Sequence, residues 1–162
     1  MPIELYRIDD RLIHGQVVVG WGQPLNLGFI VLVDDAVAAS AWEQELYRMG
    51  APPEMEVCFE SVASALAHLG EYEARPEPGM LLTGDIDTMR RIVEGAGTIR
   101  RVNVGGVHHR AGRAARLGYV FLTPDEERAL RDLAARGVTV TAQDLPATAP
   151  VPIEQVLAGR GE

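Results

Sequence analysis

A histidine and an arginine stand close together in the polar segment Arg7 to Gln16, and their spacing suits the handling of a phosphoryl group. The sequence predicts a helix that begins near Gly15, so His14 lies beside backbone N–H groups that lack intrahelical partners. Such groups attract anions. Arg11, three residues before the histidine, carries a forked cation that matches the geometry of a phosphate. The segment is therefore a candidate site for phosphoryl transfer through an imidazole.

The neighbours of the histidine add to this interpretation. The carboxylates of Asp9 and Asp10 can hydrogen-bond a ring N–H and leave the other ring nitrogen as the nucleophile. An imidazole with a pKa of about 6.5 is mostly neutral at pH 7, so it needs little activation. Gly15, without a side chain, leaves room for the backbone to approach a phosphoryl group. The same spacing also fits a simpler role, in which His14 is a loop residue that satisfies the end of a helix.

Short apolar strands alternate with amphipathic helices along the chain. This alternation predicts an α/β fold: a single-domain, open, twisted and mostly parallel sheet of about seven strands with helices on both faces, spanning residues 1–162. Ligands of such sheets bind beyond the carboxyl ends of the strands, where the strand order reverses. The predicted strands are 3–8, 29–33, 56–59, 80–83, 101–104, 119–122 and 138–141. The predicted helices begin near 15, cover 36–49, follow Ser61, cover 87–94, run from Thr123 to Gly137 and cover 153–157.

Several polar residues after strands have the sequence pattern of helix caps. The segment Thr123-Pro-Asp-Glu126 combines a capping threonine, a proline at the first helical position and a glutamate that completes a capping box. Asp34, Asp35 and Asp85 follow predicted strands and either line the cleft or cap the helices behind them. Capping is the favoured interpretation.

Composition excludes several classes of function. The 162 residues hold 15 basic side chains, all arginine, so the chain has no lysine for a Walker-type phosphate loop or for an imine. A net charge of −8 argues against nucleic acid as a partner. The single cysteine, Cys58, cannot form an intrachain disulfide, which favours a reducing cytosol. The sequence predicts neither a membrane span nor a signal peptide.

The segment Arg7-Ile-Asp-Asp-Arg-Leu-Ile-His-Gly-Gln-Val17, followed by Trp21, resembles the signature of a known family. It is similar to that of the IIB subunits of the mannose/fructose/sorbose family of the bacterial sugar phosphotransferase system. The resemblance continues through Val31-Leu-Val-Asp-Asp35 and Asn103-Val-Gly-Gly106 and covers nearly the whole chain. The first motif is eleven residues long and highly specific.

This resemblance implies a phosphocarrier. The histidine at position 14 would accept a phosphoryl group, on Nδ1, from the phosphohistidine of a IIA protein. It would pass the group to a sugar bound by the membrane subunits IIC and IID, with the arginine at position 11 holding the phosphoryl group. Asp9, Asp10, Gly15 and Gln16 are the further candidate site residues. The implied protein is cytoplasmic, associates peripherally with the permease and needs no metal or cofactor; a homo-oligomer is compatible with the sequence.

A basic segment follows the fifth predicted strand. Residues 95–124 hold five arginines and no acidic residue, a local reversal of sign in an acidic chain. Such a surface can steer a partner, and Arg110 and Arg113 are the candidate docking residues. Pairing of these arginines with acidic residues elsewhere in the chain is an equally good interpretation.

The sequence also departs from the family at Val107-His108-His109-Arg110, where other members more often carry a methionine and an aromatic residue.

Other polar residues have less specific interpretations. His108 and His109 are expected to line a loop beside the site rather than to bind a metal, because adjacent side chains on a strand point apart. His68 is expected on a helix surface. Cys58 lies in an apolar strand without a phosphate-cradling loop, so it is predicted to be a buried packing residue rather than a phosphocysteine.

Two alternative functions fit parts of the sequence. A phosphohistidine-dependent phosphatase or mutase also places its histidine after the first strand, but its motif has arginine directly before that histidine, where this chain has Ile13. A IIB-like sensor of phosphorylation state, without transport, is not distinguished by the sequence. Neither the sugar nor the direction of any regulation follows from the residues.

Overall fold

The computed structural model describes residues 3–158, apart from the side chain of Gln16. Its main sheet has seven strands in the order β3-β2-β4-β1-β5-β8-β9. All neighbours are parallel except β8 and β9, which are antiparallel. The strands of this sheet are β1 (Ile3–Ile8), β2 (Phe29–Val33), β3 (Glu56–Glu60), β4 (Gly79–Thr83), β5 (Arg101–Val104), β8 (Thr139–Ala142) and β9 (Val151–Pro152). The predicted fold class is confirmed.

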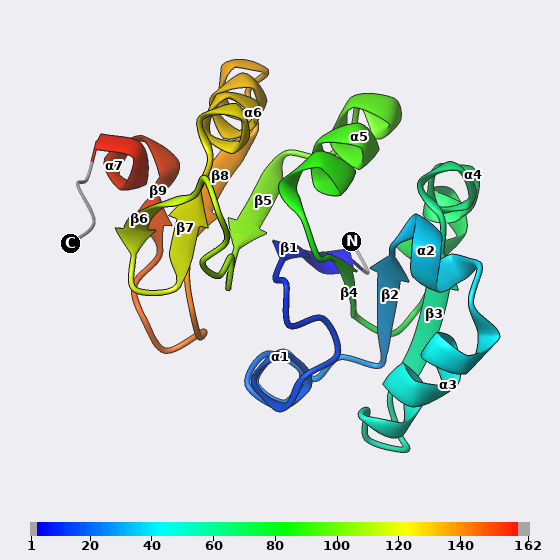
Figure 1. Cartoon of the computed structure of the whole chain (residues 1–162). Helices are drawn as coiled ribbons and strands as arrows, with labels where there is room; N and C mark the ends of the chain where they lie inside the picture. Colours follow the sequence, from blue (N-terminus) through cyan, green and yellow to red (C-terminus); the bar gives the residue numbers. More distant parts are fainter. Residues whose placement is uncertain (1–2, 159–162) are drawn as a thin grey trace.

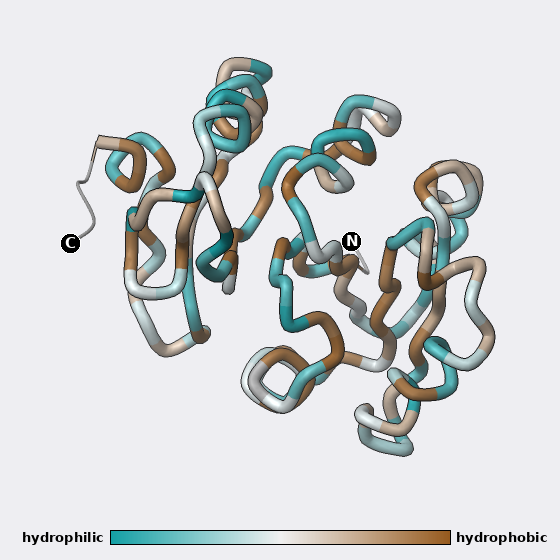
Figure 2. The backbone as a smooth tube through the Cα atoms, viewed as in Figure 1, coloured by the Kyte–Doolittle hydropathy of each residue, from teal (hydrophilic) through white to brown (hydrophobic). Residues whose placement is uncertain are grey.

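Helices cover both faces of the sheet (Figure 1). On one face α4 (Val62–Glu73), α5 (Ile86–Ala96), α6 (Pro124–Ala135) and α7 (Ile153–Ala158) contribute to the larger hydrophobic core. On the other face α1 (Gly15–Val18) and α2 (Asp35–Ala38) pack over β2, β3 and β4 in a second core, followed by α3 (Ala41–Met49). Figure 2 shows hydrophobic residues along the central strands, which lie between these layers.

The capping predictions are confirmed. The Thr123 side chain accepts a hydrogen bond from Glu126 N, and the Glu126 carboxylate accepts one from Thr123 N at 2.9 Å, which forms the predicted box. Asp34 and Asp85 cap α2 and α5. The Asp35 carboxylate accepts a hydrogen bond from Val62 N at the start of α4, at 2.9 Å.

Two predicted elements are wrong in detail. The helix predicted over 36–49 is two helices, because Ser40 ends the first turn and caps α3. The predicted sixth strand is β7 (Val120–Leu122), which leaves the main sheet and pairs antiparallel with β6 (Ala114–Leu117). Strand β9 takes the seventh place; it has two residues, one of them a proline, which is tolerated at an edge.

Candidate functional site

Three loops meet at the carboxyl end of the sheet. Strand β1 is the centre at which the strand order reverses, with β4 on one side and β5 on the other. The loop after β1 is joined to the loop after β5 by a hydrogen bond from Asp10 N to Gly106 O (2.8 Å) and to the end of β4 by one from Asp9 N to Thr83 O (2.9 Å). The loop after β8 supplies Asp144, whose carbonyl accepts from the Trp21 indole at 3.1 Å. This reversal point is where open α/β sheets bind ligands.

His14 is exposed on the loop after β1 and directly precedes α1. Its carbonyl accepts hydrogen bonds from Val17 N and Val18 N, at 2.9 and 2.8 Å, so the backbone at His14 forms the first helical turn. Gly15 is exposed, and an added Cβ there would meet no atom within 4 Å. The structure therefore presents the predicted histidine to solvent, with open space beside it. The side chain of Gln16 lies outside the described residues.

A buried ionic network lies at the start of this loop. Arg7 and Asp9 are both 0% exposed, and Arg7 Nη2 donates to Asp9 Oδ2 at 3.0 Å. The Arg11 guanidinium binds the same carboxylate through Nε to Oδ1 (2.8 Å) and Nη2 to Oδ2 (2.6 Å). Burial opposes ionisation of Asp9, but the Arg11 hydrogen bonds and the charges of Arg7 and Arg11 outweigh it and hold the pKa of Asp9 below its ordinary value. Asp9 is thus an anion shared by two cations.

Arg7 connects this network to the neighbouring strands. Its Nη1 donates to the Asn103 side chain on β5 and to Gln143 O at 2.9 Å, and its guanidinium lies 4.5 Å from the centre of the Trp21 ring. Burial lowers the pKa of Arg7, against the charge of Asp9. A side chain at Gly105 would clash with the Arg7 guanidinium, which explains the glycine in the Asn103-Val-Gly-Gly106 motif.

The two aspartates have partners other than those predicted. The sequence predicts that Asp9 and Asp10 orient the ring of His14, whereas in the structure both carboxylates are bound to other groups. Asp9 is occupied by the two guanidinium groups because it is buried between them. Asp10 accepts from His108 N at 2.7 Å and lies 2.6 Å from His108 Nδ1, so the ring that it orients is that of His108. This contact confirms that His108 lies beside the site.

The two candidate docking arginines differ in exposure. Arg113 has a 6% exposed side chain, because it forms a bidentate pair with Glu126 and donates to His108 O at 2.7 Å. Its charge is neutralised within the chain, which corrects the prediction that it presents charge to a partner. Arg116 likewise pairs with Glu127 on α6. Arg110 is exposed and lines a hollow of about 550 Å³ beside the N-termini of α5 and α6, so it keeps the predicted accessibility.

The interpretation of Cys58 needs one correction. Its side chain is partly rather than fully buried and lies 3.3 Å from the Glu56 carboxylate. Burial and this carboxylate raise the pKa of the thiol to about 11, so a thiolate nucleophile is disfavoured at neutral pH. His68 is half exposed beside Glu60, as expected of a surface residue.

Sequence reasoning missed Asn103 and Asp144 as parts of the site. Asn103 belongs to a motif that was recognised, but its amide contact with Arg7 crosses from one strand to another. Asp144 follows β8, and its carboxylate lies 3.6 Å from Arg11 Nη2. The only available signal was the general rule that loops at one edge of a parallel sheet converge.

Comparison with known proteins settles the family. The family model described as "PTS system sorbose subfamily IIB component" matches residues 3–161. The chain belongs to this family. The resemblance found in the sequence is therefore confirmed for nearly the whole chain.

Similar proteins and structures agree with this assignment. The sorbose-specific EIIB component of Klebsiella pneumoniae is 34% identical over 158 residues, 97% of this chain and 94% of that protein. The crystal structure of the IIBSor domain of the sorbose permease from that organism has a TM-score of 0.88 and 30% identity, and the match covers 98% of this chain and 97% of that one. The mannose-specific EIIAB component of Escherichia coli K12 is 36% identical over 138 residues; this chain spans only 43% of its length. In residues 3–158, no helix combines the length and apolar character required for a membrane span.

Proposed function

We propose that the chain is the phosphocarrier subunit of a sugar phosphotransferase system and that residues 1–162 act as one IIB domain. His14 accepts a phosphoryl group from the phosphohistidine of a IIA protein and passes it to a sugar held by membrane IIC and IID subunits. The observation that carries this proposal is the exposed imidazole on a loop held by the Arg7–Asp9–Arg11 network, at the ligand-binding edge of the sheet. On this view the protein works in the cytoplasm at the surface of the permease.

The transfer is an in-line displacement between two imidazoles. A ring nitrogen of His14, Nδ1 by family resemblance, donates its lone pair to phosphorus, while the bond from phosphorus to the donor's ring nitrogen breaks and that nitrogen keeps the electron pair. The second transfer repeats the displacement with a sugar hydroxyl, which loses its proton. Catalysis then consists mainly of positioning and electrostatic stabilisation.

Arg11 supplies positive charge beside the phosphoryl group in this proposal. Its side chain is 16% exposed, and its hydrogen bonds to Asp9 raise the pKa of the guanidinium, so it remains charged at every relevant pH. Asp9 fixes the direction of the guanidinium. Gly15 leaves space for the phosphoryl oxygens, and Gln16 belongs to the same turn. No metal or cofactor takes part.

The test is incubation with a phosphorylated IIA protein from the same organism, followed by mass mapping of the phosphate. We expect one acid-labile, base-stable phosphoryl group on His14 in the absence of magnesium. His14→Ala should abolish labelling, and His109→Ala, which removes another exposed histidine, should leave it intact. Arg11→Ala should slow the transfer at least tenfold.

Other outcomes would contradict the proposal. Label on Cys58 or on the His14→Ala variant would show a different acceptor, and an unchanged rate in Arg11→Ala would exclude the charge-based mechanism. Turnover of small phosphate esters would favour a phosphatase or mutase. Phosphorylation of His14 without transfer to any sugar in vesicles that contain the IIC and IID subunits would favour a sensor.

A further inference from the structure

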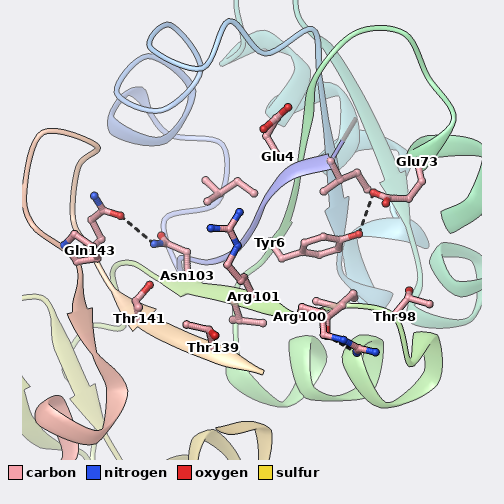
Figure 3. Close-up of a pocket in the computed structure, with 15 residues that line it drawn as sticks. Glu4, Tyr6, Glu73, Thr98, Arg100, Arg101, Asn103, Thr139, Thr141 and Gln143 are labelled. Carbon is pink, nitrogen blue, oxygen red and sulfur yellow. Dashed lines mark hydrogen bonds between the residues drawn. The ribbon is translucent and has the colours of Figure 1, made fainter. Parts of the chain in front are cut away.

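A hollow of about 570 Å³ lies away from the loop of His14 (Figure 3). It runs between the amino-terminal halves of β1 and β5, which pair only at Arg7 and Ile8 of β1, and it opens on the sheet face that carries α1. On this face α1 packs over β2 and β4, whereas the part over β5 and β8 is open, since Arg101 and Thr139 are exposed. Strand pairing places Arg101 beside Thr139 and Asn103 beside Thr141, so these four side chains share the face. The volume lies within the usual range for small-molecule sites, about 300–1,000 Å³.

The β5 and β8 side of the hollow carries hydrogen-bonding groups that the protein itself does not use. Figure 3 shows the Arg101 guanidinium reaching into the hollow, and within residues 3–158 it forms neither a hydrogen bond nor an ion pair. The hydroxyls of Thr139 and Thr141 likewise donate to no group in the described part of the chain. An arginine fork with hydroxyl neighbours is suited to a phosphate or carboxylate group.

The opposite side of the hollow carries acceptors. The Tyr6 hydroxyl donates to Glu73 Oε1 at 3.2 Å, and the exposed Glu4 lies on the same strand as Tyr6. Carboxylates accept hydrogen bonds from hydroxyl groups and repel a second anionic group. The aromatic ring and the partly buried Leu5 add apolar surface. A ligand with several negative charges is thus disfavoured, and one with hydroxyls at this end is favoured.

The wall of the hollow beside Arg101, on the side away from Tyr6, is fixed before any ligand arrives (Figure 3). Asn103 is 7% exposed; its Oδ1 accepts from Arg7 Nη1, and its Nδ2 donates to Gln143 Oε1 at 3.3 Å. Arg7 is itself held by Asp9. A preformed wall lowers the ordering cost of binding.

We propose that this hollow is a binding site for a hydroxyl-rich small molecule with a single acidic group, the chemistry of a sugar phosphate. Arg101 and the threonine hydroxyls bind the acidic group, and Glu4 and Glu73 accept hydrogen bonds from the hydroxyls. The site lies apart from the reactive loop and does not require the phosphocarrier function.

The test is an NMR titration of the unphosphorylated, ¹⁵N-labelled protein with glucose 6-phosphate, glucose and inorganic phosphate. We expect glucose 6-phosphate to shift the amide resonances of Arg101, Thr139 and Thr141, and to bind at least tenfold more tightly than the other two probes. Arg101→Gln should weaken binding about tenfold or more, the usual effect of losing a charge-assisted hydrogen bond. Arg131→Gln, which alters an exposed arginine on α6, is the matched control and should bind like the wild type.

Unchanged affinity in Arg101→Gln would overturn the proposal, as would shifts confined to residues 9–15, which would place the phosphate at the reactive loop instead. Equal binding of inorganic phosphate and glucose 6-phosphate would overturn the role of the acceptors. These results are separable from the proposed function, because His14→Ala should bind glucose 6-phosphate normally while it fails to accept a phosphoryl group.

Discussion

Replacing Asp9 by asparagine tests the ionic network most directly. Oδ1 accepts from Arg11 N and Nε, and Oδ2 accepts from Nη2 of both Arg7 and Arg11. Either orientation of an asparagine amide would therefore point its NH₂ group at other donors. Arg7 would remain 0% exposed without a carboxylate beside it. Removing one partner of a buried pair costs about 3–5 kcal/mol, so Asp9→Asn should lower the free energy of unfolding by that amount.

Urea unfolding measures this change. With an m-value of about 2 kcal/mol/M, the midpoint should fall by roughly 1.5–2.5 M while m stays constant. Asp132→Asn, which alters an exposed aspartate on α6, should move the free energy of unfolding by less than about 0.5 kcal/mol. A loss below about 1 kcal/mol in Asp9→Asn would refute the view that Asp9 is the counter-ion that keeps Arg7 buried.

Three further predictions concern the same end of the sheet. Gly105→Ala should cost about 1–3 kcal/mol in urea unfolding, because its Cβ would clash with the guanidinium of Arg7, whereas Gly118→Ala has open space and should be neutral. Arg110→Glu should slow phosphoryl transfer from a IIA protein severalfold at low salt, less at high salt, with unfolding unchanged, because Arg110 is exposed. The pKa of Asp9 is lower in the folded state than its unfolded value of about 3.9. The contribution of Asp9 to stability is therefore present above about pH 4 and is lost as the pH falls through the folded-state pKa. The stability of Asp9→Asn should accordingly depend less on pH below about 4 than that of the wild type.

Each of these has a result that would contradict it. Equal stability of the two alanine variants would show that the loop tolerates a side chain at position 105. A salt-independent rate in Arg110→Glu would remove this residue from the docking surface. Parallel pH dependence of the wild type and Asp9→Asn would show that another group controls acid unfolding.

Local sequence patterns predicted most of the secondary structure. The continuous apolar run of β2 and the capping box at Thr123 depend only on neighbouring residues, and both match the structure. Strand β6 was not predicted, because its partly exposed residues include Arg116 and lack a regular alternation. The pairing of β7 with β6 was therefore missed, although the strand β7 itself was predicted. The break at Ser40 was missed because the apolar pattern continues across it, although a serine cap is a local signal.

The reactive loop was predicted as a set of residues but not as a set of contacts. The positions of His14 and Gly15 follow from the start of a helix, which sequence can indicate. Asp9 binds Arg7 and Arg11, each two residues away, whereas the partner of Asp10 depends on which strand lies beside β1. The strand order β4-β1-β5 is a long-range property. A carboxylate that is close to one histidine in the sequence can therefore contact a different histidine in the folded chain, as Asp10 contacts His108.

The hydrogen bonds of the Asn103 and Arg7 side chains have a consequence for the energetics of the loop. They tie the segment before His14 to β5 and to the loop after β8, which lie on the same side of the central strand β1, in the resting protein. The entropy lost in immobilising that segment is thus a cost of folding and does not recur in each chemical cycle. Because the segment before His14 is rigid, the exposed imidazole of His14 can react with successive macromolecules without rearrangement of the residues around it.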